Sequence, residues 1–178
     1  MKTYIALLRG INVSGQKKIP MADLRKLLAE EGFNNVKTYI QSGNVIFQSD
    51  LKDEITIAER ISKAILKKFG FDVSVLVKTP EDFQAIFEAS PFSDEALKKS
   101  YFMLLFDKPK PELAKQIKQL STSEEQFTIT ENCIYFFSLN GYGKTKFNNN
   151  FFERKLNIIA TARNYNTMLK LLSLSAES

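Results

Sequence analysis

Apolar residues occur at two different spacings along the first 79 residues, and these spacings separate strands from helices. Continuous apolar runs predict strands, and apolar residues at helical intervals, such as Leu24, Leu27 and Leu28, predict amphipathic helices. In chain order, the expected elements are a strand at 4–8, a helix at 20–31 that also buries Met21, strands at 36–40 and 45–47 around a turn, a helix from Asp53 to Gly70 that buries Ala58, Ile61 and Ile65, and a strand at 73–77. This order of elements is that of the ferredoxin-like fold.

The same order returns in the second half of the chain, after a short connecting helix that begins at Pro80. The expected elements there are a strand at 101–106, a helix at 111–120, strands at 127–130 and 133–138, a helix carrying Phe147, Phe151 and Leu156, a short strand at 158–160 and a final helix through Tyr165 and Leu172. The sequence therefore predicts an α+β protein of two ferredoxin-like subdomains, residues 1–79 and 80–178, related by an internal duplication.

The two halves differ in the connection between their first strand and first helix. The second half has four residues there, 107–110, whereas the first half has a loop of eleven, 9–19. This loop carries Arg9, Asn12, Lys17 and Lys18 with two glycines and leads into a helix N-terminus. Backbone N–H groups and the helix dipole converge at such a place, so the loop is expected to meet an anion.

Charge and rare residues narrow the chemistry. The net charge is +5, and residues 1–79 hold thirteen Lys and Arg against eight Asp and Glu, while the remainder is balanced. There is no histidine and only one cysteine, Cys133, which lies in an apolar run and is expected to be a buried, inert thiol. These absences exclude catalytic triads with histidine, histidine-ligated metals and structural zinc sites. We expect no metal and no cofactor.

The first residues and the hydropathy pattern predict a compartment. No apolar run is long enough to cross a bilayer, and the N-terminus lacks the pattern of a signal peptide. A single cysteine agrees with a reducing environment. We expect a cytoplasmic protein without a membrane partner.

Two glycine-containing stretches resemble phosphate-binding loops without matching them. Residues 10–15 have the glycine spacing but lack the following Lys and Ser or Thr, and residues 138–145 end in Gly-Lys-Thr but begin with serine. Only 33 residues follow Thr145, and none forms an apolar strand ending in aspartate. A nucleotide triphosphatase is therefore not expected.

Three further polar sets are candidates for ligand contacts. The turn contributes Gln41, Ser42 and Asn44, although turn chemistry alone accounts for such residues. The second half contributes Lys144, Thr145 and Lys146, in and after the 138–145 stretch. It also contributes Arg163 and Asn164 before the last helix, although capping of that helix alone would account for Asn164. Tyr4 and Phe47 stand roughly where RNA-recognition domains stack bases, but core packing explains them better.

These motifs resemble a known family. The segments LLRGINV (7–13), PM (20–21), LR (24–25) and TYIQSGNV (38–45), with GKTKF (143–147) and ATARNYNT (160–167), are similar to the signatures of the bacterial domain-of-unknown-function 1697 family. Ser14 and Tyr165 depart from the usual pattern, where glycine and tryptophan are common. The resemblance implies two ferredoxin-like subdomains and supplies no activity, substrate or catalytic residue.

The candidate residues are rich in hydrogen-bond donors and contain no carboxylate or imidazole. They predict a non-catalytic protein that binds a phosphorylated small molecule or a nucleic acid between its two halves. One alternative is a small transferase or hydrolase that uses Lys17, Lys144 or Asp23, and another is a protein-interaction module. The sequence leaves the oligomeric state open.

Overall fold

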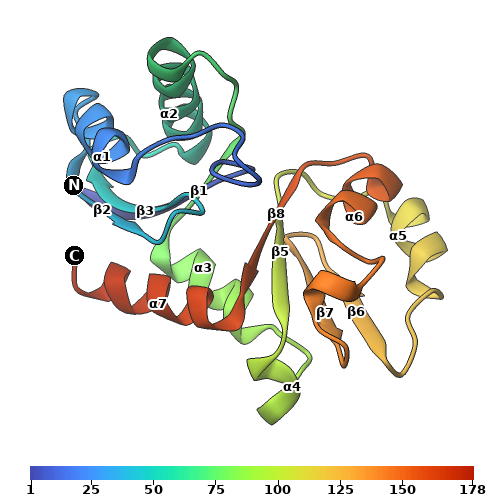
Figure 1. Ribbon diagram of the computed structural model, residues 1–178. Coiled ribbons are helices and arrows are strands. Elements are labelled where there is room, and N and C mark those ends of the chain that lie inside the picture. The colour runs from blue at the N-terminus through green and yellow to red at the C-terminus, as the bar shows by residue number, and fades with distance from the viewer. The chain divides into compact units, whose positions relative to one another are not determined.

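The protein divides into two compact units. The structure is a computed structural model that describes all 178 residues. Unit 1 consists of residues 1–84 and 170–178, and unit 2 of residues 85–169, so the chain passes from one unit to the other inside α3 (Pro80–Glu88) and α7 (Tyr165–Ala176). Each unit contains one four-stranded sheet (Figure 1). None of the helices combines the length and hydropathy that a membrane crossing requires.

Unit 1 has the predicted order of strands and helices. Its elements are β1 (Lys2–Leu8), α1 (Met21–Glu30), β2 (Asn34–Tyr39), β3 (Asn44–Ser49), α2 (Glu54–Phe69) and β4 (Val75–Lys78). The strands pair in the order β2-β3-β1-β4, and every neighbouring pair is antiparallel. This is the ferredoxin-like arrangement, in which α1 and α2 lie on one face of the sheet (Figure 1).

The core of unit 1 forms where these helices meet the sheet. Tyr4, Ala6 and Leu8 point from β1 into the same apolar cluster as the buried faces of both helices. The predicted face of α1 is confirmed, since Met21, Leu24, Leu27 and Leu28 are all buried. The prediction for α2 was wrong in one position, because Ala58 is only half-buried; its buried face consists of Ile57, Ile61, Ala64 and Ile65.

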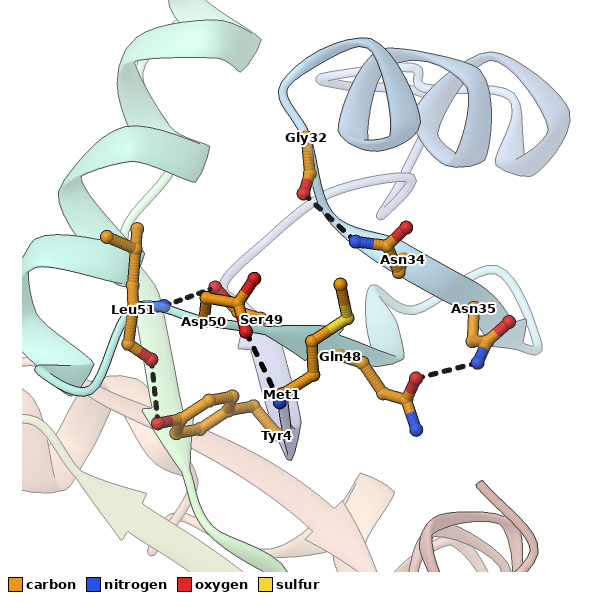
Figure 2. Close-up of polar contacts among 9 residues, drawn as sticks. All are labelled: Met1, Tyr4, Gly32, Asn34, Asn35, Gln48, Ser49, Asp50 and Leu51. Atoms are coloured by element: carbon orange, nitrogen blue, oxygen red, sulfur yellow. Dashed lines mark hydrogen bonds and ion pairs between the residues drawn. The ribbon is translucent and has the colours of Figure 1, made fainter.

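Tyr4 and Phe47 are core residues. Their side chains are 1% and 0% exposed, and their ring centroids lie 5.9 Å apart. The Tyr4 hydroxyl donates to the carbonyl oxygen of Leu51 at 2.9 Å, and burial raises the pKa of this phenol (Figure 2). A ring enclosed in this way cannot stack on a nucleobase, so the core interpretation of this pair is confirmed.

Unit 2 repeats the topology. Its elements are α4 (Asp94–Lys98), β5 (Tyr101–Leu105), α5 (Pro111–Lys118), β6 (Glu125–Ile129), β7 (Cys133–Ser138), the short 3-10 turn η1 (Tyr142–Lys144), α6 (Asn149–Leu156) and β8 (Ala160–Asn164). The strands pair in the order β6-β7-β5-β8, again antiparallel throughout. The predicted pair of ferredoxin-like subdomains is therefore present.

Three details in unit 2 differ from the prediction, and the first is α4, which no predicted element covers. The fourth strand begins at Ala160 and runs to Asn164, because it pairs along the whole length of β5. Phe147 precedes α6 instead of lying on it, since Asn148 caps that helix by accepting a hydrogen bond from the Phe151 N–H at 3.0 Å. Phe147 still joins the core, with its ring centroid 5.2 Å from that of Phe127.

The single thiol is enclosed in the unit 2 sheet. Cys133 is 0% exposed, and burial raises the pKa of its thiol well above the usual value. We expect Cys133 to resist Ellman's reagent in the native protein and to react fully in denaturant, because only the accessible thiolate is nucleophilic. Rapid reaction of the native protein would contradict this burial.

The tip of the β2–β3 hairpin, residues 40–44, approaches β1 at Gly43. This residue has a φ of +81°, and a Cβ atom placed on it would lie 2.7 Å from the Leu8 Cβ and 3.1 Å from Ile11 side-chain carbons. The Leu8 N–H donates to the Gly43 carbonyl oxygen at 2.8 Å, which holds the two segments together. Position 43 therefore needs glycine both for its backbone conformation and for space.

We expect Gly43→Ala to lower the free energy of unfolding by about 3 kcal/mol, since left-handed strain and overpacking add. The matched control is Gly70→Ala, at φ +80° with nothing within 4 Å of the added carbon. It should cost only about 1 kcal/mol, the backbone contribution alone. Urea unfolding of both variants measures the difference, and equal losses would show that close packing at Gly43 contributes nothing.

Candidate functional site

Loop 9–19, which connects β1 to α1, has an unusual backbone. Five of its residues have a positive φ, between +43° and +76°: Gly10, Asn12, Ser14, Gly15 and Lys17. Only two of these are glycines, so three residues with a side chain adopt a conformation that such residues rarely take. A β-bridge between Val13 and Gln16 and a 3.1 Å hydrogen bond from the Asn12 N–H to the Lys17 carbonyl fold the loop on itself.

Asn12 joins this loop to the hairpin tip. Its Nδ2 donates to the carbonyl oxygens of Ile19 at 3.0 Å and Gln41 at 2.8 Å. Its Oδ1 accepts from the Ile19 N–H at 2.8 Å. Both amide hydrogens are used within the protein, so Asn12 positions the loop and the tip relative to each other.

The hairpin tip is held from inside. Asn44 is completely buried, and its Nδ2 donates to the Tyr39 carbonyl and to the Ser42 Oγ, both at 3.0 Å. Of the three tip residues predicted as ligand contacts, Ser42 and Asn44 therefore stabilise the turn, and Gln41 is exposed. The predicted strand 36–40 ends one residue early, because Ile40 belongs to the turn.

The opposite flank of the loop is fixed to the segment that leads into β4. The Arg9 N–H donates to the Ser74 carbonyl at 2.9 Å, and Lys17 Nζ donates to the Asp72 carbonyl. Lys18 is exposed and has no hydrogen-bond or ion-pair partner in the protein. The structure thus brings the seven candidates of the first half together: Arg9, Asn12, Lys17, Lys18, Gln41, Ser42 and Asn44.

Backbone donors remain available on the loop surface. The N–H groups of Gly10, Ser14 and Gly15 donate to no acceptor in the protein, and all three residues are exposed. Exposed N–H groups of successive turn residues are a common anion-binding arrangement. Ser14 and Gly15 are such a pair, in the turn closed by the hydrogen bond from the Gln16 N–H to the Val13 carbonyl. The Lys18 side chain lies close to this turn, because its Cε atom would be 4.0 Å from a Cβ atom placed on Gly15.

The candidates of the second half lie at two places in unit 2. Lys144 and Lys146 are exposed around η1, and the Lys146 Nζ lies 5.0 Å from the centroid of the Phe147 ring. The Thr145 Oγ1 accepts a hydrogen bond from the Phe147 N–H at 2.9 Å. Thr145 therefore shapes the turn before α6.

Arg163 and Asn164 have structural contacts at the end of β8. Arg163 is only 7% exposed, and its Nη1 donates to Thr161 Oγ1 at 2.7 Å and to the Ala162 carbonyl at 2.9 Å. Burial lowers the pKa of Arg163 to about 10, so it is charged at neutral pH. Asn164 caps α7 by accepting from the Thr167 N–H at 2.9 Å.

Two exposed apolar residues were missed by the sequence analysis. Val13 in loop 9–19 is 57% exposed and Ile40 in the hairpin tip is 50% exposed. Each is the chain neighbour of one partner in the hydrogen bond between Asn12 and Gln41. The only sequence signal was the position of Ile40 next to a predicted turn, which is not enough to assign it outside the strand.

Elsewhere in unit 1, a cleft with a volume of about 570 Å³ has a size suited to a small ligand. It lies between the start of β1, the start of α3 and the last turns of α7, and Lys2 and Glu81 are among its lining residues. None of the candidate residues lines it. No group of three or more cysteine, aspartate or glutamate side chains could hold a metal ion.

We expect Asn12→Ala to lower the free energy of unfolding by about 2 to 3 kcal/mol and to accelerate hydrogen exchange of the Ile19 amide, because several hydrogen bonds are lost. The matched control is Asn35→Ala: Asn35 also has a positive φ, +49°, but makes one exposed hydrogen bond, to Gln48 Oε1 at 2.7 Å (Figure 2). This control should cost about 1 kcal/mol. Unchanged exchange at Ile19 would refute the positioning role of Asn12.

Comparisons with known proteins agree with this architecture. A family model described as "Protein of unknown function (DUF1697)" matches residues 1–135. Among solved structures, a conserved bacterial protein from Streptococcus pneumoniae, SP0830, is 27% identical, with a TM-score of 0.76, over 97% of this chain and 98% of that one. No curated protein matches the chain.

Proposed function

This chain belongs to the DUF1697 family of proteins of unknown function, and we propose that loop 9–19 binds the phosphate of a nucleic acid or of a phosphorylated small molecule. One observation carries the proposal: the loop is fixed on both flanks in a conformation that leaves exposed backbone N–H groups beside an unpaired lysine, Lys18. A donor surface that is already ordered loses little entropy on binding an anion.

The charge of the surroundings supports an anionic ligand. Loop 9–19 and the hairpin tip contain no aspartate or glutamate. The positive excess of the chain belongs to its first 79 residues, as counted above. Phosphate contacts need charge and donors, and they need no group that transfers a proton.

Binding without catalysis fits the residues better than the enzyme alternative. General acid–base catalysis requires a side chain that is free to exchange a proton at the reacting atom. The Lys17 ammonium donates to the Asp72 carbonyl. Asp23 lies exposed in the first turn of α1, where the helix dipole stabilises a carboxylate. These positions have structural explanations.

The test uses labelled single-stranded DNA and RNA and fluorescence anisotropy over a range of salt concentrations. We expect Lys18→Ala to weaken binding about threefold, as one exposed ionic contact contributes about 0.7 kcal/mol. The slope of log affinity against log salt should also become less steep by about 0.7. Inorganic pyrophosphate, titrated by calorimetry, covers the small-ligand case.

The matched control is Lys68→Ala, which removes one exposed positive charge from the last turn of α2. It should leave affinity and salt dependence close to those of the unmodified protein. Equal effects of the two substitutions would show that binding follows net charge alone. No binding of any of these anions at low salt would overturn the proposed function.

A further inference from the structure

Ile40 occupies a conformation that is costly for its side chain. Its φ is +50°, in the left-handed region, where a β-branched residue is an outlier. The other non-glycine residues with a positive φ are Asn12, Ser14, Lys17, Asn35, Asp94 and Asn157, none of which is β-branched. Ile40 is also half exposed, so burial of its side chain offsets little of this cost.

The surrounding contacts prevent the turn from relaxing. Gly43 is packed against Leu8 and Ile11, and Asn44, the first residue of β3, is buried. The carbonyl of Gln41, the residue after Ile40, is held by Asn12. The hairpin tip therefore presents an aliphatic side chain to solvent in a fixed position, and strain of this kind clusters at functional sites.

A second apolar side chain lies on the partner segment. Val13 follows Asn12 and is 57% exposed, so each of the two segments joined by the Asn12–Gln41 hydrogen bond carries one exposed apolar residue. The same two segments carry Lys18 and the exposed side-chain amide of Gln41, which can both donate and accept. Apolar contact, anion attraction and a hydrogen-bonding amide are thus combined over a few residues.

We propose that this surface takes a nucleoside phosphate: the phosphate is bound by loop 9–19, and the base lies against Ile40 and Val13 with its edge read by Gln41. The inference rests on the proposed function and adds the chemical class of the ligand. A planar heterocycle has an apolar face and a hydrogen-bonding edge, which match the two aliphatic side chains and the amide. An acyl chain would need a larger continuous apolar patch.

The experiment compares nucleoside diphosphates with inorganic pyrophosphate by calorimetry. The four common ribonucleoside diphosphates share the diphosphate group with pyrophosphate and add a base. We expect the best of them to bind at least tenfold more tightly than pyrophosphate. In the Ile40→Asn variant, the best nucleoside diphosphate should bind less than threefold more tightly than pyrophosphate, while the affinity for pyrophosphate is retained.

Ile40→Asn should also raise the midpoint of thermal unfolding, because asparagine tolerates the left-handed conformation. A gain in stability together with a loss of base-dependent affinity separates a ligand contact from a structural role. The matched control is Ile55→Asn, at a 70% exposed isoleucine on α2. It should change neither the nucleotide advantage nor pyrophosphate affinity, and it should not raise the midpoint.

The outcomes are distinguishable. If pyrophosphate, the nucleotides and a labelled oligonucleotide all fail to bind, both the proposed function and this inference are overturned. Equal affinity for pyrophosphate and the nucleotides, or an unchanged advantage in Ile40→Asn, overturns the inference alone. A labelled oligonucleotide added as a third probe identifies the source: tighter binding than the free nucleotide, lost in Ile40→Asn, supports a nucleic acid chain, and weaker binding supports a free nucleotide.

Discussion

The close approach of the β2–β3 hairpin tip to the end of β1 is the constraint on which the N-terminal site depends. The Leu8 N–H bonds to the Gly43 carbonyl, and the absence of a side chain at Gly43 leaves room for Leu8 and Ile11. From this contact the Asn12 side chain extends the connection to Ile19 and Gln41. Two segments about thirty residues apart in sequence thereby form one ordered surface.

This order has a cost that the core of unit 1 offsets. Asn12, Ser14 and Lys17 in loop 9–19 and Ile40 in the tip have a positive φ. This conformation costs about 1 to 2 kcal/mol at each of Ser14, Lys17 and Ile40, whereas asparagine tolerates it. The buried faces of α1 and α2 and the inward side chains of β1 supply a continuous apolar cluster beneath them. A loop can keep such a backbone only when the surrounding structure determines its path, which is common at ligand sites.

The internal comparison of the two units shows which connection is particular to unit 1. Both sheets have the same strand order and the same antiparallel pairing. In unit 2, β5 is followed after a few residues by α5, with no counterpart of loop 9–19. Because the ferredoxin-like fold forms in unit 2 without such a loop, the fold alone does not explain the exposed residues of loop 9–19.

Sequence alone determined the strands and the main helices of both units, because their apolar spacing is local and strong, but it did not predict α4. The helix from Asp53 to Gly70 is an example, with its cap and its left-handed end at the expected residues. It also singled out the polar residues of loop 9–19 and the tip. The sequence-based prediction misplaced Ile40 and Phe147. The position of Ile40 depends on residues that are distant in sequence, and Phe147 is excluded from α6 because Asn148 caps that helix.

Tertiary structure decided which polar residues stay exposed and which hold the protein together. Asn12, Ser42, Asn44, Thr145 and Asn164 all carry donors or acceptors that a sequence pattern would assign to a ligand, and all bond to the chain itself. The reason is physical: a polar side chain binds whichever partner lies within reach, and reach is set by the fold. The amino-acid composition shows that hydrogen-bond donors are present. Only packing determines which donors stay exposed, as the Lys18 ammonium does.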